Sequence, residues 1–225
     1  MTGRTNSVRA INNYDDKTTP NYIADGLVAL YDGIKNTRSG HTSLSGVWED
    51  LSGNNIDLLS ENNPNYQVFL IDSAHFYQNA MSYASAIPNI ITVEFVLLPE
   101  VFGGSANWIM QLNGTNTKNV CISRAKTDIQ FGNGRGFPIS PNKISAISYD
   151  FANDECVIDG IKVQHNSYSD SWSRTPTSGI QLSMKDNYPL IGSLYSLRLY
   201  SRTLTAEEKA HNYAIDIKRF NIPNE

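Results

Sequence analysis

The sequence has few of the residues from which metal centres, disulfide frameworks and nucleic-acid-binding surfaces are built. Its two cysteines, Cys121 and Cys156, lie far apart and match no metal-ligand spacing. We favour two reduced thiols in the core, with a disulfide between them as the alternative. The four histidines show no metal or triad spacing. The 18 Lys and Arg residues are scattered along a chain of net charge −4, so we expect no nucleic-acid binding.

Long apolar runs are also absent. No stretch approaches the roughly 20 apolar residues of a membrane helix, so we expect no membrane insertion. Residues 1–26 contain no apolar segment of the kind found in secretory signal peptides. If the protein acts outside a cell, we expect it to leave by another route, for example on a virus particle released by lysis.

Short segments with strand patterns, separated by turn signals, make up most of the chain. The longest is Ile90–Leu98, whose β-branched residues predict a central strand. Asp159-Gly160 predicts the turn of a hairpin, and Ser52–Asn55 is rich in turn residues. About fourteen such segments and one helix predict an all-β fold, a two-sheet antiparallel sandwich formed by residues 25–225.

Residues 1–24 are polar and have no periodic pattern, which predicts an N-terminal arm or linker. Such a segment is either a frayed terminus or an arm that docks onto a partner subunit. We expect a homo-oligomer, and an arm of this kind would contact other subunits.

The C-terminal segment predicts a strand, a turn and a helix. Leu194–Tyr200 alternates, with Tyr195, Leu197 and Leu199 on one face and Leu194, Ser196, Arg198 and Tyr200 on the other. Thr205 and Glu208 form a capping box at the start of the helix. We expect the helix to pack on the sandwich through an apolar stripe, which consists of Ala210, Tyr213, Ala214, Ile217 and Phe220.

Several of these segments resemble one family. Gly26–Gly33 and Trp48–Asn54 resemble the opening of concanavalin A-like, laminin-G-like jelly-roll domains, and Thr92–Phe95 resembles a strand of that family. Val157–Gly160 is similar to its hairpin, and Ile191–Thr205 to its terminal signature. The resemblance implies a jelly-roll sandwich of the kind found in bacterial surface proteins and tailed bacteriophages. It says little about activity, since this fold has many functions.

Paired catalytic carboxylates are not evident. Glycoside hydrolysis needs two carboxylates about 5 to 10 Å apart. The chain lacks the Glu-x-Asp-x-Glu triplet of laminarinase-type enzymes on this fold, Glu94 stands alone on its strand, and the adjacent Asp154 and Glu155 point to opposite faces. We therefore expect no enzymatic activity, with a glycoside hydrolase as the less favoured alternative.

Two kinds of binding site are predicted. Sugar binding uses aromatic platforms and planar polar groups on exposed loops, and the candidates are Trp172, Tyr168, Trp108, Asn113, Arg124, Asn133 and Arg135. Trp108 opens a strand, so core packing is its alternative role. Relatives in this family often bind calcium, which makes Asp32, Asp50 and Asp57 candidate Ca²⁺ ligands, with ordinary turn chemistry as the alternative.

These observations predict a non-catalytic structural or adhesion protein of a bacteriophage particle, in the tail, a fibre or a capsid decoration. Its partners would be host surface glycans and, through residues 1–24, other virion subunits. The alternative is a carbohydrate-binding module of a bacterial surface or secreted protein.

Two truncations test the predicted organisation. Deleting residues 205–225 should lower the melting temperature, because it removes the helix that packs on the sandwich. Deleting residues 1–20 should leave the domain folded but impair its assembly, as measured by circular dichroism and light scattering. If the second truncation unfolds the protein, the arm hypothesis is wrong.

Overall fold

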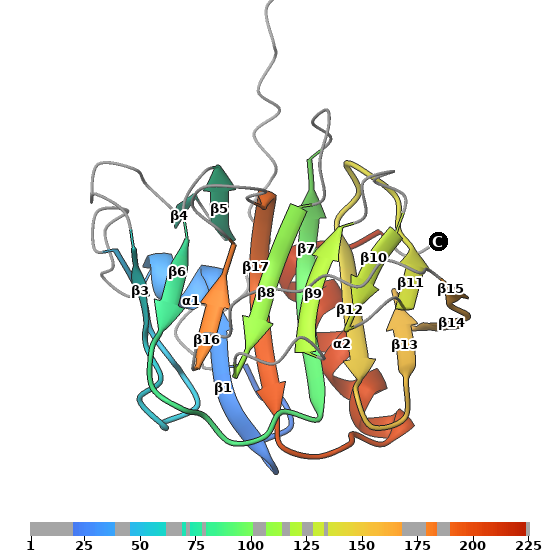
Figure 1. The fold of residues 1–225 in the computed structure, drawn as a ribbon, viewed down its shortest axis with the longest axis horizontal. Helices are drawn as coiled ribbons and strands as arrows, with labels where there is room; N and C mark the ends of the chain where they lie inside the picture. The colour runs from blue at the N-terminus through green and yellow to red at the C-terminus, as the bar shows by residue number, and fades with distance from the viewer. Residues whose placement is uncertain are drawn as a thin grey trace, which may run out of the picture.

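The protein is described by a computed structural model over residues 20–38, 46–61, 69–70, 73–77, 80–100, 107–113, 118–122, 128–132, 135–167, 179–183 and 190–223 (Figure 1). Its helices are α1 (Gly33–Arg38) and α2 (Ala206–Phe220). Its strands are β1 (Leu27–Asp32), β2 (Val47–Trp48), β3 (Leu58–Ser60), β4 (Phe69–Leu70), β5 (Ser73–Tyr77), β6 (Met81–Tyr83), β7 (Thr92–Pro99), β8 (Asn107–Leu112), β9 (Asn119–Ile122), β10 (Asp128–Phe131), β11 (Arg135–Pro138), β12 (Ser145–Asp150), β13 (Glu155–Ile158), β14 (Ile161–Val163), β15 (Asn166–Ser167), β16 (Ile180–Leu182) and β17 (Ile191–Tyr200).

The strands form two antiparallel sheets packed face to face, as the sequence predicts. One sheet has the order β14-β13-β12-β7-β17-β5-β4, with β1 also paired to β17. The other has the order β15-β11-β10-β9-β8-β16-β6-β3-β2. In Figure 1 the second sheet lies in front, and α2 lies behind the first sheet. The helix therefore covers the outer face of the sheet that contains β7 and β17.

Apolar side chains from both sheets fill the space between them. Phe131 of β10 stacks on Tyr149 of β12 with ring centroids 3.9 Å apart, which joins the two sheets directly. Both cysteines are thiols buried in the structure. Strand β7 lies between β12 and β17, so the prediction of a central strand near residues 90–98 is confirmed. Among the described residues, no helix is both long enough and apolar enough to cross a bilayer.

The start of α2 follows from its sequence. The Thr205 side chain accepts a hydrogen bond from the Glu208 backbone N–H, and the Glu208 carboxylate accepts one from the Thr205 N–H. The predicted capping box is therefore present. Arg202 donates two further hydrogen bonds to Glu208, and these bonds, with that of the Thr205 backbone, lower the pKa of Glu208 to about 2. The helix ends at Asn221, which has left-handed backbone angles.

The face of α2 that packs on the sheet is not the predicted apolar stripe. Ala210 and Ala214 are exposed, whereas Tyr213 and Ile217 are half-buried at the edge of the contact with Phe220. The buried residues recur at helical spacing but are mostly polar: Lys209, Asn212, Asp216, Arg219 and Phe220. The apolar-stripe prediction is wrong because the sheet offers charged partners to this helix.

Those partners lie on β17, β7 and β1. The buried Arg198 guanidinium of β17 donates to both oxygens of Asp216, at 2.8 and 2.6 Å. Arg219 donates two hydrogen bonds to Asp32, at the end of β1. Burial is tolerated for such groups when each charge is paired and hydrogen-bonded. Two ion pairs thus hold the helix on the sheet.

A bulge in β17 changes the predicted alternation of that strand. Its register against β7 shifts between Leu194 and Ser196. Leu194 therefore lies in the sandwich core together with Leu197 and Leu199, while Tyr195 packs with the cluster beside α2. The prediction that placed Leu194 on the face of Arg198 and Tyr200 is wrong, because an extra residue in a strand reverses the side-chain pattern.

Helix α1 follows β1 directly and was not predicted, since the sequence indicated a single helix at the C-terminus. The Asp32 carboxylate accepts a hydrogen bond from the Lys35 backbone N–H at 2.7 Å, so Asp32 caps the first turn. The same carboxylate binds Arg219, which places α1 close to the end of α2.

The segment before β1 contacts α2. The Tyr22 hydroxyl donates to Asp216 at 2.7 Å, and the Ile23 backbone N–H donates to Asn212 at 3.0 Å. The Arg198 guanidinium carbon lies 4.1 Å from the centroid of the Tyr22 ring. Residues 20–24 therefore pack on the domain although the sequence assigned them to an arm, and residues 1–19 lie outside the described residues.

Replacing Asp216 by alanine tests how the helix is held. The variant leaves the Arg198 charge buried with one of its two carboxylates missing, so we expect the free energy of unfolding to fall by about 3–5 kcal/mol. Lys218→Ala, on the exposed side of the same helix, should change it by less than about 0.5 kcal/mol. Urea denaturation measures both, and equal effects would contradict this role of Asp216.

Candidate functional site: a groove beside the C-terminal helix

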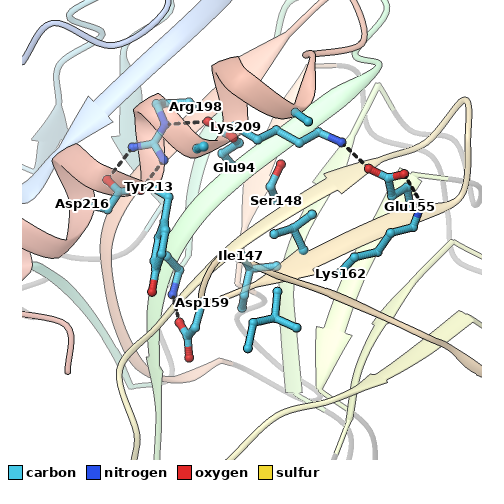
Figure 2. A pocket seen from close by; sticks show the side chains of 16 residues that line it. Glu94, Ile147, Ser148, Glu155, Asp159, Lys162, Arg198, Lys209, Tyr213 and Asp216 are labelled. Carbon is cyan, nitrogen blue, oxygen red and sulfur yellow. Dashed lines mark hydrogen bonds and ion pairs between the residues drawn. The ribbon is translucent and has the colours of Figure 1, made fainter. Parts of the chain in front are cut away.

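A groove of about 540 Å³ lies between α2 and the outer face of strands β12, β13 and β14 (Figure 2). Its floor is the sheet, and one wall is the helix. Apolar side chains come from both sides and include Val157, Ile161 and Tyr213. Charged side chains lie among them, so the groove is amphipathic.

One row of residues crosses the floor from strand to strand. Glu94 of β7 lies opposite Arg198 of β17 on one side and opposite Ser148 of β12 on the other. Ser148 lies opposite Val157, and Val157 lies opposite Lys162 at the edge of the sheet. Side chains opposite one another in a sheet share a face. Along this row the floor is therefore charged beneath the helix, uncharged at Ser148 and Val157, and charged again at the edge strand.

Arg198, at the end of this row beneath α2, connects the sheet to the helix. It donates through Nε to Glu94 Oε2 at 3.1 Å, in addition to its two bonds with Asp216. Asn212 of α2 also donates to Glu94 Oε2, at 2.7 Å. Burial raises the pKa of Glu94 above its ordinary value, and the Arg198 charge opposes this shift. Burial alone would lower the pKa of Arg198, but Asp216, Tyr22 and Glu94 raise it, so Arg198 stays charged.

Two contacts connect α2 to the β13–β14 hairpin across the groove. Lys209 Nζ lies 2.8 Å from Glu155 Oε1, and Lys162 binds the other oxygen of Glu155. Hydrogen bonds from Lys162 and Lys209 lower the pKa of Glu155. On the hairpin turn, a Cβ added to Gly160 would lie 2.6 Å from the Tyr213 ring, so glycine allows the ring to pack there. Gly160 also has a positive φ of 79°, as the predicted turn requires.

None of the predicted sugar-binding residues that the structure describes lines this groove. Trp108 is only 2% exposed in the core, so it cannot serve as a surface platform, because its ring faces other side chains of the protein. The Asn113 side chain bonds to the backbone N–H and C=O of Ile87. Arg135 is exposed but forms an ion pair with Asp154. The other four, Tyr168, Trp172, Arg124 and Asn133, lie outside the described residues.

The structure gives the three predicted Ca²⁺ ligands other partners. Asp32 binds Arg219, as described above. Asp50 accepts hydrogen bonds from the backbone N–H groups of Leu30, Ser52 and Ile56, and Asp57 accepts one from the Asp50 N–H. In the part of the chain that the structure describes, no group of three or more His, Cys, Asp and Glu side chains is placed to hold a metal ion.

A serine, a histidine and a glutamate also come together at the β5–β17 pair. His75 Nδ1 lies 3.1 Å from Ser193 Oγ and 3.6 Å from Glu100 Oε1. In a catalytic triad the serine and the acid meet opposite nitrogens of the imidazole ring. Here both meet Nδ1, so this group lacks the geometry of a triad.

Comparison with known proteins gives a likeness of fold. No protein-family model and no curated protein matches the sequence. Among solved structures, the receptor binding domain of a botulinum neurotoxin C/D mosaic serotype is 14% identical with a TM-score of 0.58, and the match covers 87% of this chain and 52% of that one. The binding domain of botulinum neurotoxin serotype D is 13% identical with a TM-score of 0.56, covering 87% and 53%. Trypanosoma rangeli sialidase is 12% identical with a TM-score of 0.56, covering 86% and 33%.

The chain thus spans between a third and about half of the length of these proteins. At such low identity the likeness concerns the β-sandwich alone. It is compatible with the predicted jelly roll, and it identifies the chain as a β-sandwich domain with a C-terminal helix packed on one sheet.

Proposed function

We propose that the chain is a non-catalytic adhesion module that binds a glycan in the groove between α2 and strands β12–β14. The observation that carries this proposal is the amphipathic groove itself. Binding sites for small ligands are concave and largely apolar, with a few polar groups that fix the orientation. The groove combines an apolar edge with a polar floor.

The chemistry of the lining matches a sugar ring. Sugars present apolar C–H faces, which pack on aromatic and aliphatic side chains, and hydroxyl groups, which bond to polar ones. The Tyr213 ring and the Ile161 side chain, which is 66% exposed, supply apolar surface. Glu94, Ser148, Glu155 and Lys209 supply donors and acceptors.

The carboxylates of the groove support binding rather than hydrolysis. A glycosidase needs one carboxyl group that can release a proton and another that acts as base or nucleophile. Two carboxylates of the groove, Glu94 and Asp216, both bind the Arg198 guanidinium. Arg198 donates to both oxygens of Asp216, so this carboxylate is not free to act as the base or nucleophile. Release of reducing ends from bacterial polysaccharides would contradict a non-catalytic role.

The structural neighbours are consistent with recognition at a cell surface. One is a receptor binding domain of a toxin, and another is a sialidase whose structure was solved in complex with sialic acid. Both likenesses concern fold, so they support the proposal only by analogy.

The setting we propose is a bacteriophage particle, in which the domain is part of the tail, a fibre or a capsid decoration. It rests on the resemblance to jelly-roll domains of tailed bacteriophages and on the polar segment of residues 1–19. The alternative is a carbohydrate-binding module of a bacterial surface protein. Co-purification of a multimer with virus particles would support the first, and a monomer absent from particles would exclude it.

Two tryptophan substitutions on α2 test whether the groove binds glycans. Ala210 and Ala214 are both exposed, one turn apart, but only Ala210 lines the groove. Ala210→Trp should fill the groove and weaken binding at least about tenfold. Ala214→Trp carries the same change in helix propensity, so it should bind like the wild type. A glycan array followed by calorimetry measures this. Equal binding by both variants, or no glycan bound by the wild type, would contradict the proposal.

A further inference from the structure

We infer that the groove takes neutral or amino sugars and rejects sugars that carry a carboxylate, such as sialic or uronic acids. This inference rests on the proposed function and specifies its ligand. Three observations carry it: a buried hydroxyl without a partner, a carboxylate directly opposite it that can only accept, and the pairing of every described cation in the lining.

The hydroxyl belongs to Ser148, in the middle of the floor. The residue is 7% exposed, and its Oγ has no hydrogen-bond partner within the described part of the protein. Figure 2 shows this hydroxyl on the side of the floor that faces Glu94 and Lys209. A buried polar group without a partner costs about 1–3 kcal/mol, so it is rare unless a ligand or water satisfies it. A group that enters the floor of the groove would supply the missing bond.

The carboxylate belongs to Glu94, which lies directly opposite Ser148 in the sheet. The side chains of Arg198 and Asn212 both donate to Oε2. Both of these bonds go to the same oxygen of the carboxylate. An ionised carboxylate can only accept, whereas a hydroxyl can both donate and accept. A sugar hydroxyl or amino group beside both residues can donate to Glu94 and also bond to Ser148, which a carboxylate cannot do.

The charges of the lining residues also favour a sugar without a carboxylate. Among the lining residues that the structure describes, four are acidic, Glu94, Glu155, Asp159 and Asp216, and three are basic, Lys162, Arg198 and Lys209. Asp159 is paired with Lys143, which lies next to the groove. Each basic residue is held: both lysines by Glu155, and Arg198 by Glu94 and Asp216. An anionic sugar would have to displace one of these carboxylates to find a counter-charge. The described cations of the lining are all paired, so the groove offers a carboxylate no free counter-charge, and like charges brought together without a new partner repel.

The test compares the binding of glycans on one array by the wild-type protein and by four variants. Wild-type protein should bind neutral or amino sugars but not their sialylated or uronate counterparts. Its affinity for neutral sugars should change little between about 0.05 and 0.5 M NaCl, whereas its affinity for amino sugars, whose ammonium group is charged near neutral pH, should fall, since screening acts on charged ligands. Ser148→Ala should weaken binding about 3- to 10-fold, the value of one hydrogen bond, without lowering the melting temperature. Ser201→Ala, at an exposed hydroxyl away from the groove, is the matched control and should bind like the wild type.

The outcomes separate this inference from the proposed function. Binding of carboxylated sugars that Ala210→Trp abolishes would overturn the inference and leave glycan binding in the groove intact. Unchanged affinity in Ser148→Ala would also overturn it. Glu155→Gln removes the charge that pairs with Lys162 and Lys209, so it should raise the affinity for sialylated glycans relative to neutral ones. An unchanged ratio of these affinities would contradict the charge argument. Absence of any bound glycan would overturn both proposals.

Discussion

The guanidinium of Arg198 is the interaction on which this structure most depends. It comes from β17, binds Glu94 of the neighbouring strand β7, and binds Asp216 of the helix with both terminal nitrogens. Removing three charges from water is costly, and only close, multiple hydrogen bonds offset that cost. The planar guanidinium provides them in one fixed arrangement. The helix therefore has one favourable position on the sheet, whereas a purely apolar contact would tolerate sliding.

That position also determines the groove. Because α2 turns its polar residues toward the sheet, Ala210 and Tyr213 lie at the side of the contact and face the β13–β14 hairpin. The contacts of Lys209 with Glu155 and of Tyr213 with Gly160 keep the helix and the hairpin together. The same side chains that stabilise the helix thus form the floor and the rim of the candidate site, and stability and recognition are coupled at this place.

Local sequence signals predicted much of the fold and little of the site. The capping box of Thr205 and Glu208 and the Asp159-Gly160 turn depend on neighbours in sequence, so they could be read directly. The buried face of α2 could not, because the partners of Asp216 and Arg219 lie on β17 and β1. A charged residue inside an otherwise apolar strand, as Glu94 is, was the available signal for a buried ion pair. Ser148 gave no signal, since a single serine in a strand becomes notable only when its neighbours are known.

The contact of Tyr22 with this cluster has a mechanical consequence. Tyr22 precedes β1 in the chain, yet its ring lies against Arg198 and its hydroxyl is bonded to Asp216. A pulling force on the chain before Pro20 would therefore reach α2 and the centre of the sheet before it reaches β1. The load would be shared by several buried bonds that must break together, rather than by the bonds of a strand that open one at a time. Peeling the chain from its N-terminal side therefore requires that the contacts of Tyr22 with Arg198 and Asp216 break before those of β1.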